Sequence, residues 1–155
     1  MFILLFFVFA YNDIKHEQLV VQQEEQKQYC FLNKHLQDAI LAASDSTGLD
    51  PYLIDAIIVA ESGGDVFAKS KTNVRGPMQV TKKTATIYGL NPYDIYENIL
   101  AGSMYLKDMI EEFKDTSVAL VAYNSGPTFV RNNFELITFS YSRRVNRIYE
   151  SNKEI

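Results

Sequence analysis

Glu61 stands where a carboxyl group could act as an acid. It lies near the end of residues 50–64, Asp-Pro-Tyr-Leu-Ile-Asp-Ala-Ile-Ile-Val-Ala-Glu-Ser-Gly-Gly, which predict one short helix. Asp50 suits the N-cap, Pro51 suits the first helical position, and the two glycines end the helix. Isoleucines lie seven, four and three residues before Glu61, so the glutamate shares the stripe that is expected to face the core.

A carboxyl group in that position has an unusual acidity. Burial raises the pKa of a carboxylic acid, and the partial negative charge at a helix C-terminus acts in the same direction. An acid that stays protonated near neutral pH is what general acid catalysis requires. The alternative is that Glu61 pairs with an arginine, such as Arg75 or Arg144, for structure alone. This stretch by itself favours the ion pair, because structural ion pairs are commoner than active sites.

The elements that must position this glutamate are also helices. Periodicity and capping residues predict a helix from Cys30 to Ser44 ended by Gly48, a short helix from Thr81 to Tyr88, a longer one from Asn98, one over 118–123 and a last one around 138–151. Gly102 lies inside the longer helix, where glycine costs up to about 1 kcal/mol relative to alanine. Its presence there predicts close approach by a neighbouring segment. No strand-like alternation of useful length is present, so the predicted fold class is mainly α.

Composition excludes several kinds of function. The 155 residues carry 47% hydrophobic and 22% charged residues, which is typical of one folded domain. A formal charge of -4 gives no electrostatic case for binding nucleic acid. Cys30 is the only cysteine, so no intramolecular disulfide can form. The two histidines, His16 and His35, lack matched partners, and we expect neither a metal site nor a cofactor.

The N-terminal quarter divides into two segments ahead of the predicted domain at 30–152. Residues 2–10 are an uninterrupted apolar run, too short to span a bilayer but long enough for the core of a signal peptide, so 1–10 are predicted to direct export. Residues 11–29 are polar and predict a spacer. A buried N-terminal helix and an uncleaved anchor are the alternatives for the apolar run.

Three separated motifs carry a resemblance to a known family. They are Glu-Ser-Gly-Gly at 61–64, Gly-Pro-Met-Gln at 76–79 and Ala-Tyr-Asn-Ser-Gly-Pro at 122–127. In this order and at these spacings they resemble the catalytic domain of the soluble-type lytic transglycosylases, which are relatives of goose-type lysozyme. Asn-Ile-x-x-Gly-x-x-Tyr-Leu at 98–106 and Tyr-x-x-Arg-Val at 141–145 extend the resemblance. It implies a lysozyme-like helical domain with a substrate cleft.

The chain departs from the family pattern at a few positions. Pro77 replaces the usual leucine, Asn73 stands where glycine is common, and Ile137 and Phe139 occupy positions that often hold Glu and Arg. These departures bear on the shape of the cleft and on contacts with the peptide stem more than on catalysis.

The resemblance implies a mechanism that needs one carboxylate. Most glycosidases use two carboxylates, one on each side of the bond. Asp55 lies six residues before Glu61, roughly 240° around the helix, so it points to another face. Asp65 follows the glycines and stays open as a second group. In the family route, Glu61 protonates the oxygen between N-acetylmuramic acid and N-acetylglucosamine and then deprotonates the C6 hydroxyl, which closes a 1,6-anhydro ring.

The resemblance also implies roles for the residues around the glutamate. Ser62 and Tyr123 would position Glu61 or nearby substrate, Gln79 and Asn124 would bind sugar or N-acetyl groups, Met78 would pack the sugar, and Tyr141 would close the cleft. Each role has a structural alternative: Met78 and Tyr141 could be ordinary core, and Ser62 and Asn124 could satisfy helix ends.

Two rival functions remain at this stage. One is hydrolysis by water, as in goose-type lysozyme. The other is a non-catalytic module that binds glycan or serves as a scaffold within an envelope-spanning secretion or conjugation apparatus. The expected partner is peptidoglycan. Association with a secretion or conjugation apparatus is compatible with catalytic activity. The expected location is the periplasm or cell envelope.

Overall fold

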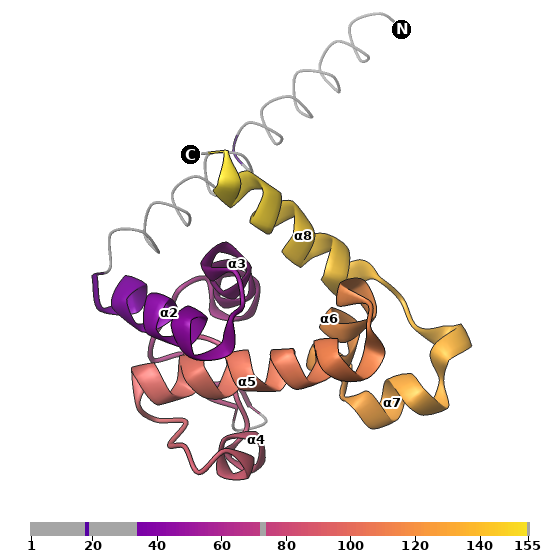
Figure 1. The fold of residues 1–155 in the computed structure, drawn as a ribbon, viewed down its shortest axis with the longest axis horizontal. Helices are drawn as coiled ribbons and strands as arrows, with labels where there is room; N and C mark the ends of the chain where they lie inside the picture. Colours follow the sequence, from indigo (N-terminus) through magenta and orange to yellow (C-terminus); the bar gives the residue numbers. More distant parts are fainter. Residues whose placement is uncertain (1–17, 19–33, 72–73, 155) are drawn as a thin grey trace, which may run out of the picture.

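The structure is a computed structural model that describes Gln18 and residues 34–71 and 74–154. The predicted signal peptide at 1–10, the spacer at 11–29 apart from Gln18, and Asn73 lie outside these ranges. Within them the chain folds into the following helices (Figure 1): α2 (Lys34–Thr47), α3 (Pro51–Ser62), α4 (Lys82–Ile87), α5 (Ile95–Phe113), α6 (Thr116–Ser125), α7 (Pro127–Asn132), the 3-10 helix η1 (Phe134–Leu136) and α8 (Ser140–Lys153). The described residues contain isolated β-bridges at Arg75 but no strand. None of the described helices is long and apolar enough to cross a membrane.

Helix α3 has the predicted ends. The carboxylate of Asp50 accepts a hydrogen bond from the Tyr52 amide at 2.9 Å, and Pro51 is the first helical residue. Gly63 ends the helix in the left-handed conformation, at φ 64°, and its amide donates to the Val59 carbonyl at 3.1 Å. Local sequence therefore determines where α3 starts and stops, and with that the position of Glu61.

Burial of α3 extends further around the helix than the sequence predicted. Every residue from Leu53 to Ala60 is buried, whereas a single inward stripe was expected. Figure 1 shows α3 nearly end-on in the middle of the molecule, and α2 and α8 pack against it. Even Asp55 is only 5% exposed, and its carboxylate accepts a hydrogen bond from the side-chain Nδ2 of Asn152 in α8 at 2.7 Å. A helix enclosed on all sides needs no polar face, which is why the stripe was too narrow.

Helix α5 begins earlier than predicted. Asp94 is its N-cap and accepts a hydrogen bond from the Glu97 amide at 3.0 Å, so the helix starts at Ile95 rather than at Asn98. Asn98 instead lies one turn inside, with its side chain fully buried. Thr81 caps α4 as predicted.

The segment after α6 also differs from the prediction. The sequence indicated only a break at 124–127, but Pro127 is the first residue of α7, a position that suits proline. Helix α7 and η1 are short, and neither carries the periodicity that would reveal a helix in sequence. The helices predicted over 118–123 and around 138–151 are present as α6 and α8. Residues 118–122 of α6 are all buried, and Val145 of α8 faces the core.

Gly102 makes the close approach that its place in a helix predicted. A Cβ atom at this position would lie 2.7 Å from the Met78 sulfur and 2.8 Å from the Met78 Cβ. Helix α5 therefore packs directly onto the segment around Met78, and that segment carries one of the three sequence motifs.

We expect Gly102→Ala to destabilise the protein. Alanine gains about 1 kcal/mol of helix propensity over glycine, but overpacking a core typically costs 1–3 kcal/mol, and the contact here includes the Met78 Cβ, which is not a flexible chain end. The net loss should be about 1 kcal/mol or more, measured as a lower midpoint in urea unfolding. Glu111→Ala, at an exposed position of the same helix, is the control and should change little. An unchanged midpoint for Gly102→Ala would show that Met78 moves aside freely.

Candidate active site

Glu61 lies at the C-terminal end of α3, half-buried between α8 and the 65–80 loop. Tyr141, at the start of α8, donates a hydrogen bond from its hydroxyl to Glu61 Oε1 at 2.6 Å. The two residues are 80 positions apart in sequence, so this contact exists only because α8 packs along α3.

The electrostatics of Glu61 favour the protonated acid. Burial raises its pKa above the ordinary value, while the hydrogen bond from Tyr141 and the positive charge of Arg144 act in the opposite direction and only partly offset it. The structural ion pair that the sequence favoured does not form in the described residues. Arg144 acts on Glu61 through space, and the Arg75 guanidinium lies over the Tyr93 ring, 5.4 Å from its centroid. Burial also raises the pKa of Tyr141, so its hydroxyl keeps its proton.

Two hollows meet at Glu61. The first, of about 540 Å³, lies between the end of α6 and the segment around α4. The second, of about 450 Å³, lies on the side of the 65–70 loop and Arg144. Glu61, Ser70 and Gln79 line both hollows, so the two hollows adjoin at these residues and are together called the depression. An acid between two adjoining hollows can lie beside one bond of an extended substrate.

Gln79 reaches this depression from a tight turn. The Gln79 amide donates to the Gly76 carbonyl at 3.1 Å, which closes a four-residue β-turn with Pro77 at its second position. Gln79 has φ 46°, a left-handed conformation that non-glycine residues adopt rarely. Its side-chain amide donates to the same carbonyl at 3.0 Å. The turn thus fixes the Gln79 side chain at the edge of both hollows.

Met78 does not line the depression. Its side chain has no exposed surface and packs against α5, so the prediction that it packs a sugar is corrected: the structural alternative, ordinary core, holds. The reason is that the turn points Met78 inward, toward Gly102, while Gln79 points outward. The backbone carbonyl of Met78 accepts a hydrogen bond from the Tyr123 hydroxyl at 2.8 Å.

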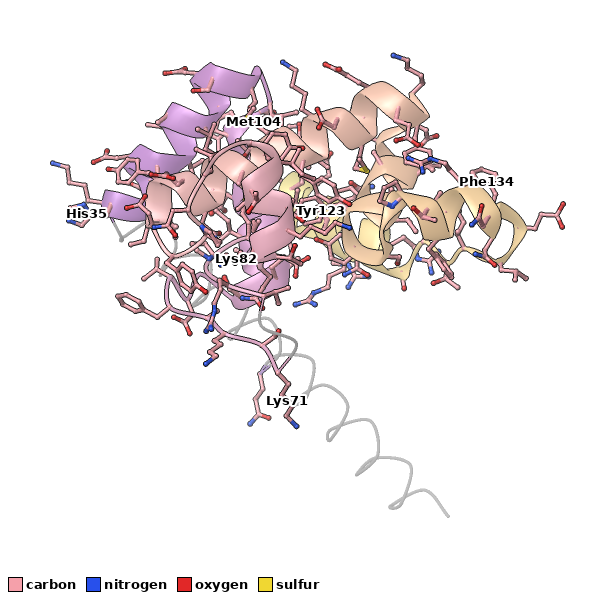
Figure 2. All side chains as sticks on the ribbon, turned by 90° about the horizontal axis from the view of Figure 1, so that it is seen from below. His35, Lys71, Lys82, Met104, Tyr123 and Phe134 are labelled. Atoms are coloured by element: carbon pink, nitrogen blue, oxygen red, sulfur yellow. The ribbon has the colours of Figure 1, made fainter. Side chains whose placement is uncertain are left out.

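Tyr123 and Asn124 form the α6 side of the first hollow. Tyr123 uses its hydroxyl on the turn rather than on Glu61, although burial and then the Glu61 charge raise its pKa well above the ordinary value. Asn124 is exposed and lines the hollow. Figure 2 shows Tyr123 toward the middle of the helical body, whereas Lys71 on the 65–80 loop extends away from it.

Ser62 satisfies the end of α3. Its hydroxyl donates to the Ile58 carbonyl at 3.1 Å and accepts from the Gly64 amide at 3.2 Å. Both hydrogen bonds of the Ser62 hydroxyl therefore go to backbone groups at the end of α3, in agreement with the structural alternative given for this residue. Ser62 also lines the second hollow. These two hydrogen bonds hold the backbone that directly follows Glu61.

The two other acids near Glu61 differ in position. Asp55 points to another face of α3, as predicted, and is buried against α8 away from both hollows. Asp65 is exposed, lines the second hollow, and accepts a hydrogen bond from the Phe67 amide at 2.9 Å. Glu61 is the only carboxylic acid among the described residues that line the first hollow. In the described ranges no group of His, Cys, Asp and Glu is arranged to hold a metal ion.

Sequence reasoning missed two contributors to the site. Tyr105 of α5 lines the first hollow, with its ring centroid 5.5 Å from that of Tyr123. Asn98 was interpreted as a helix start but hydrogen-bonds the segment that carries Gln79. The Asn-Ile-x-x-Gly-x-x-Tyr-Leu motif contains both, so the signal was present in the sequence without an assigned role.

Comparison with known proteins assigns a family to this arrangement. The family model described as the transglycosylase SLT domain matches residues 38–140. The chain belongs to the transglycosylase SLT domain family. This confirms the resemblance, and the match contains Glu61 together with the Gln79 and Tyr123 motifs.

Relatives of this SLT domain come from phage and bacteria. A transglycosylase of Enterobacteria phage PRD1 is 33% identical over 109 residues, which cover 70% of this chain and 40% of the relative. Proteins named membrane-bound lytic murein transglycosylase F are 39% identical in Desulfosudis oleivorans, covering 58% of this chain and 22% of the relative, and 44% identical in Methylobacillus flagellatus, covering 54% and 20%. The chain thus spans less than half the length of each of these relatives.

A solved structure confirms the fold class. The X-ray structure of an inactive glutamate-to-glutamine mutant of lytic transglycosylase Slt from Pseudomonas aeruginosa matches with a TM-score of 0.58 at 22% identity, covering 74% of this chain and 22% of that one. The mainly α, lysozyme-like fold predicted from sequence is therefore correct.

The raised pKa of Glu61 makes a prediction about stability. A raised folded-state pKa means that the folded protein binds this proton more tightly than the unfolded chain does, so wild-type stability falls as pH rises from about 4.3, the ordinary value for glutamate, through the folded pKa. Glu61→Gln keeps an acceptor for Tyr141 but carries no charge. We expect its melting temperature to equal or exceed that of the wild type at pH 8, with the difference shrinking toward pH 4. A difference that is independent of pH would contradict the assignment.

Proposed function

We propose that this SLT domain is a peptidoglycan lytic transglycosylase, which cleaves the β-1,4 bond between N-acetylmuramic acid and N-acetylglucosamine and leaves 1,6-anhydro-N-acetylmuramic acid ends. The observation that carries the proposal is the position of Glu61: a half-buried acid with a raised pKa, hydrogen-bonded by Tyr141, at the junction of two hollows.

In the first step Glu61 acts as a general acid. Burial raises its pKa and so favours the protonated form, and that proton goes to the oxygen of the glycosidic bond as the bond to C1 breaks. The positive charge that develops at C1 is stabilised by the carbonyl oxygen of the substrate's own N-acetyl group. The N-acetylglucosamine portion leaves with a new hydroxyl group.

In the second step the same carboxylate acts as a base. The hydrogen bond from Tyr141 and the charge of Arg144 stabilise Glu61 once it is ionised. The carboxylate takes the proton of the C6 hydroxyl of the muramic acid residue, and the C6 oxygen attacks C1 to close the 1,6-anhydro ring. Glu61 ends protonated, as it began, and no water is consumed.

Gln79 and Asn124 are the side chains best placed to bind the sugars. Gln79 lies at the edge of both hollows, and the hydrogen bond from its amide nitrogen to Gly76 leaves its side-chain oxygen available to a substrate donor such as an N-acetyl N–H. Asn124 is exposed on the α6 side of the first hollow. Tyr141, Tyr123 and Ser62 act as supports for Glu61 and for the turn, rather than as ligands of the sugar.

The names of the relatives support this function. Two are named lytic murein transglycosylases, and the matched structure is titled as an inactive glutamate-to-glutamine mutant of such an enzyme. Murein lies in the cell envelope, so we propose that this chain acts there, and export through residues 1–10 stays a prediction. Association with a secretion or conjugation apparatus also stays a prediction.

The identity of the released ends tests the mechanism. Purified peptidoglycan incubated with the protein should yield muropeptides with 1,6-anhydro ends, one water lighter than the reducing form by mass spectrometry. Glu61→Gln should remain folded and release less than about a thousandth of the wild-type product, in keeping with the 10²–10⁴-fold contribution of acid–base groups for each of two roles.

Asp65→Asn separates this mechanism from hydrolysis by water. Asparagine keeps the side-chain acceptor for the Phe67 amide but removes the charge, so it is a matched change. Cleavage to anhydro ends by Asp65→Asn fits the single-carboxylate route. Reducing ends from the wild type, lost in Asp65→Asn, would instead establish a hydrolase. Binding of peptidoglycan without any release would favour a glycan-binding module.

Arg144 supplies a further test through pH. Its charge lowers the pKa of Glu61, so Arg144→Gln should raise that pKa and move the alkaline limb of the kcat/KM profile to higher pH. Arg143→Gln is the matched control, because Arg143 is exposed, adjacent, and outside both hollows. An alkaline limb that moves equally in both variants, or in neither, would mean that the limb does not report Glu61.

A further inference from the structure

Asn98 is a fully buried asparagine whose side chain is committed to the segment that leads to Gln79. Its Oδ1 accepts a hydrogen bond from the Met78 amide at 3.1 Å. Its Nδ2 donates to the Arg75 carbonyl at 2.8 Å and to the Pro92 carbonyl at 2.9 Å. Asn98 has no exposed surface, and both hydrogens of its Nδ2 and its Oδ1 are hydrogen-bonded to backbone groups. Two of the three partners, Arg75 and Met78, flank Gly76-Pro77.

The turn also fits closely over the face of α5 that carries Asn98. A Cβ atom at Gly76 would lie 2.6 Å from the Asn98 Cγ, so only glycine allows the turn to reach the asparagine. One helical turn later, Gly102 allows the Met78 side chain to approach in the same way. Because residues i and i+4 share a helix face, Asn98 and Gly102 together form the surface of α5 on which residues 75–78 pack.

The backbone conformation of Gln79 is linked to this packing of residues 75–78 on α5. The left-handed backbone at φ 46° is unfavourable for glutamine and persists only where neighbouring contacts determine it. On the chain before Gln79, the contacts are those of Asn98 with Arg75 and Met78, and α6 adds the hydrogen bond from Tyr123 to the Met78 carbonyl. Without Asn98, the Met78 amide would lose its partner in a buried region, and the Arg75 carbonyl would keep only the hydrogen bond from the Val80 amide at 2.9 Å. The turn would then be held by fewer contacts on its α5 side, and Gln79 could leave its left-handed conformation.

We propose that Asn98 is a positioning residue for catalysis: by holding the turn at 75–78 against α5, it sets the left-handed conformation of Gln79 and hence the place of the Gln79 side chain beside Glu61. The proposal rests on the proposed function, in which Gln79 binds the sugar at the cleavage site. Asn98 does not touch the substrate, and its effect passes through Gln79.

A double-mutant cycle with Gln79 tests this. Asn98→Ala alone should lower kcat/KM on the order of 10²-fold, as expected for a misplacement of about 1 Å at a reacting centre. In a Gln79→Ala background the same change should have little further effect, because residues that act through one another are not additive. Activities are compared per folded molecule, with the folded fraction taken from circular dichroism.

Asn152→Ala is the matched control. Asn152 is also buried, at 2% exposure, and donates to Asp55, but it lies at the end of α8 and contacts neither the turn nor the hollows. Asn152→Ala should lower stability while leaving kcat/KM per folded molecule within about threefold of wild type. Substitutions at distant, independent sites usually affect one another by only a few tenths of a kcal/mol, which sets this margin. If Asn98→Ala does not fold, Asn98→Ser replaces it, because serine keeps a polar group in the buried site and places no charge against the Arg75 and Pro92 carbonyls.

A readout independent of activity separates this inference from the proposed function. The backbone carbon chemical shifts of Gln79 report its left-handed conformation, and they should move toward ordinary values in Asn98→Ala but not in Asn152→Ala. Moved shifts with a non-additive cycle support the inference. Unchanged Gln79 shifts, or additive effects of Asn98→Ala and Gln79→Ala, would overturn it while leaving the transglycosylase intact, whereas a wild type that releases no product would overturn the proposed function.

Discussion

The hydrogen bond from the Tyr141 hydroxyl to the Glu61 carboxylate joins the start of α8 to the end of α3. It belongs to a set of three: Tyr149 donates to Asp50, and Asn152 donates to Asp55. All three acids of the segment from Asp50 to Ser62 thus accept a hydrogen bond from α8. Together with the apolar residues buried on every side of α3, these hydrogen bonds join the two helices along their length. Of the three, only the Tyr141 hydrogen bond reaches Glu61 itself, because the other two meet α3 at acids that lie six and eleven residues before it.

The same packing gives Glu61 two opposed influences. Enclosure by the core raises its pKa and favours the acid, while Tyr141 and Arg144 favour the carboxylate. A residue that must give up a proton and then take one back benefits from neither extreme, because a carboxyl group too acidic would not protonate the bond and one too basic would not release the proton. Asp55, on the same helix, is placed differently: its carboxylate accepts a hydrogen bond from Asn152 of α8 and lies away from the hollows. Position on the helix, and not residue type alone, separates a structural acid from a candidate catalytic one.

Sequence predicted those features that depend on local chemistry. The ends of α3 follow from Asp50, Pro51 and Gly63, and the contact of Gly102 follows from the cost of glycine inside a helix. Other features needed the tertiary structure. Met78 and Gln79 are neighbours in one motif, and only the left-handed backbone at Gln79 decides that the first points into the core and the second toward the hollows. Asn98 looked like a helix start because asparagine caps helices, but Asp94 already serves as the cap, and the partners of Asn98 lie 20 and 23 residues earlier in the chain.

Pro77 shows how a departure from a family pattern can be compatible with the site. Proline lacks an amide hydrogen, so it fits only where that donor is unused. In this turn the amides of Met78 and Gln79 make the hydrogen bonds, to Asn98 and to Gly76, and position 77 is required for none. Proline also favours the second position of a β-turn, where its fixed φ reduces the number of conformations of the unfolded chain. The turn is thus determined from within by Gly76-Pro77 and from outside by α5 and α6. That double determination is what allows a strained glutamine to be held beside the acid.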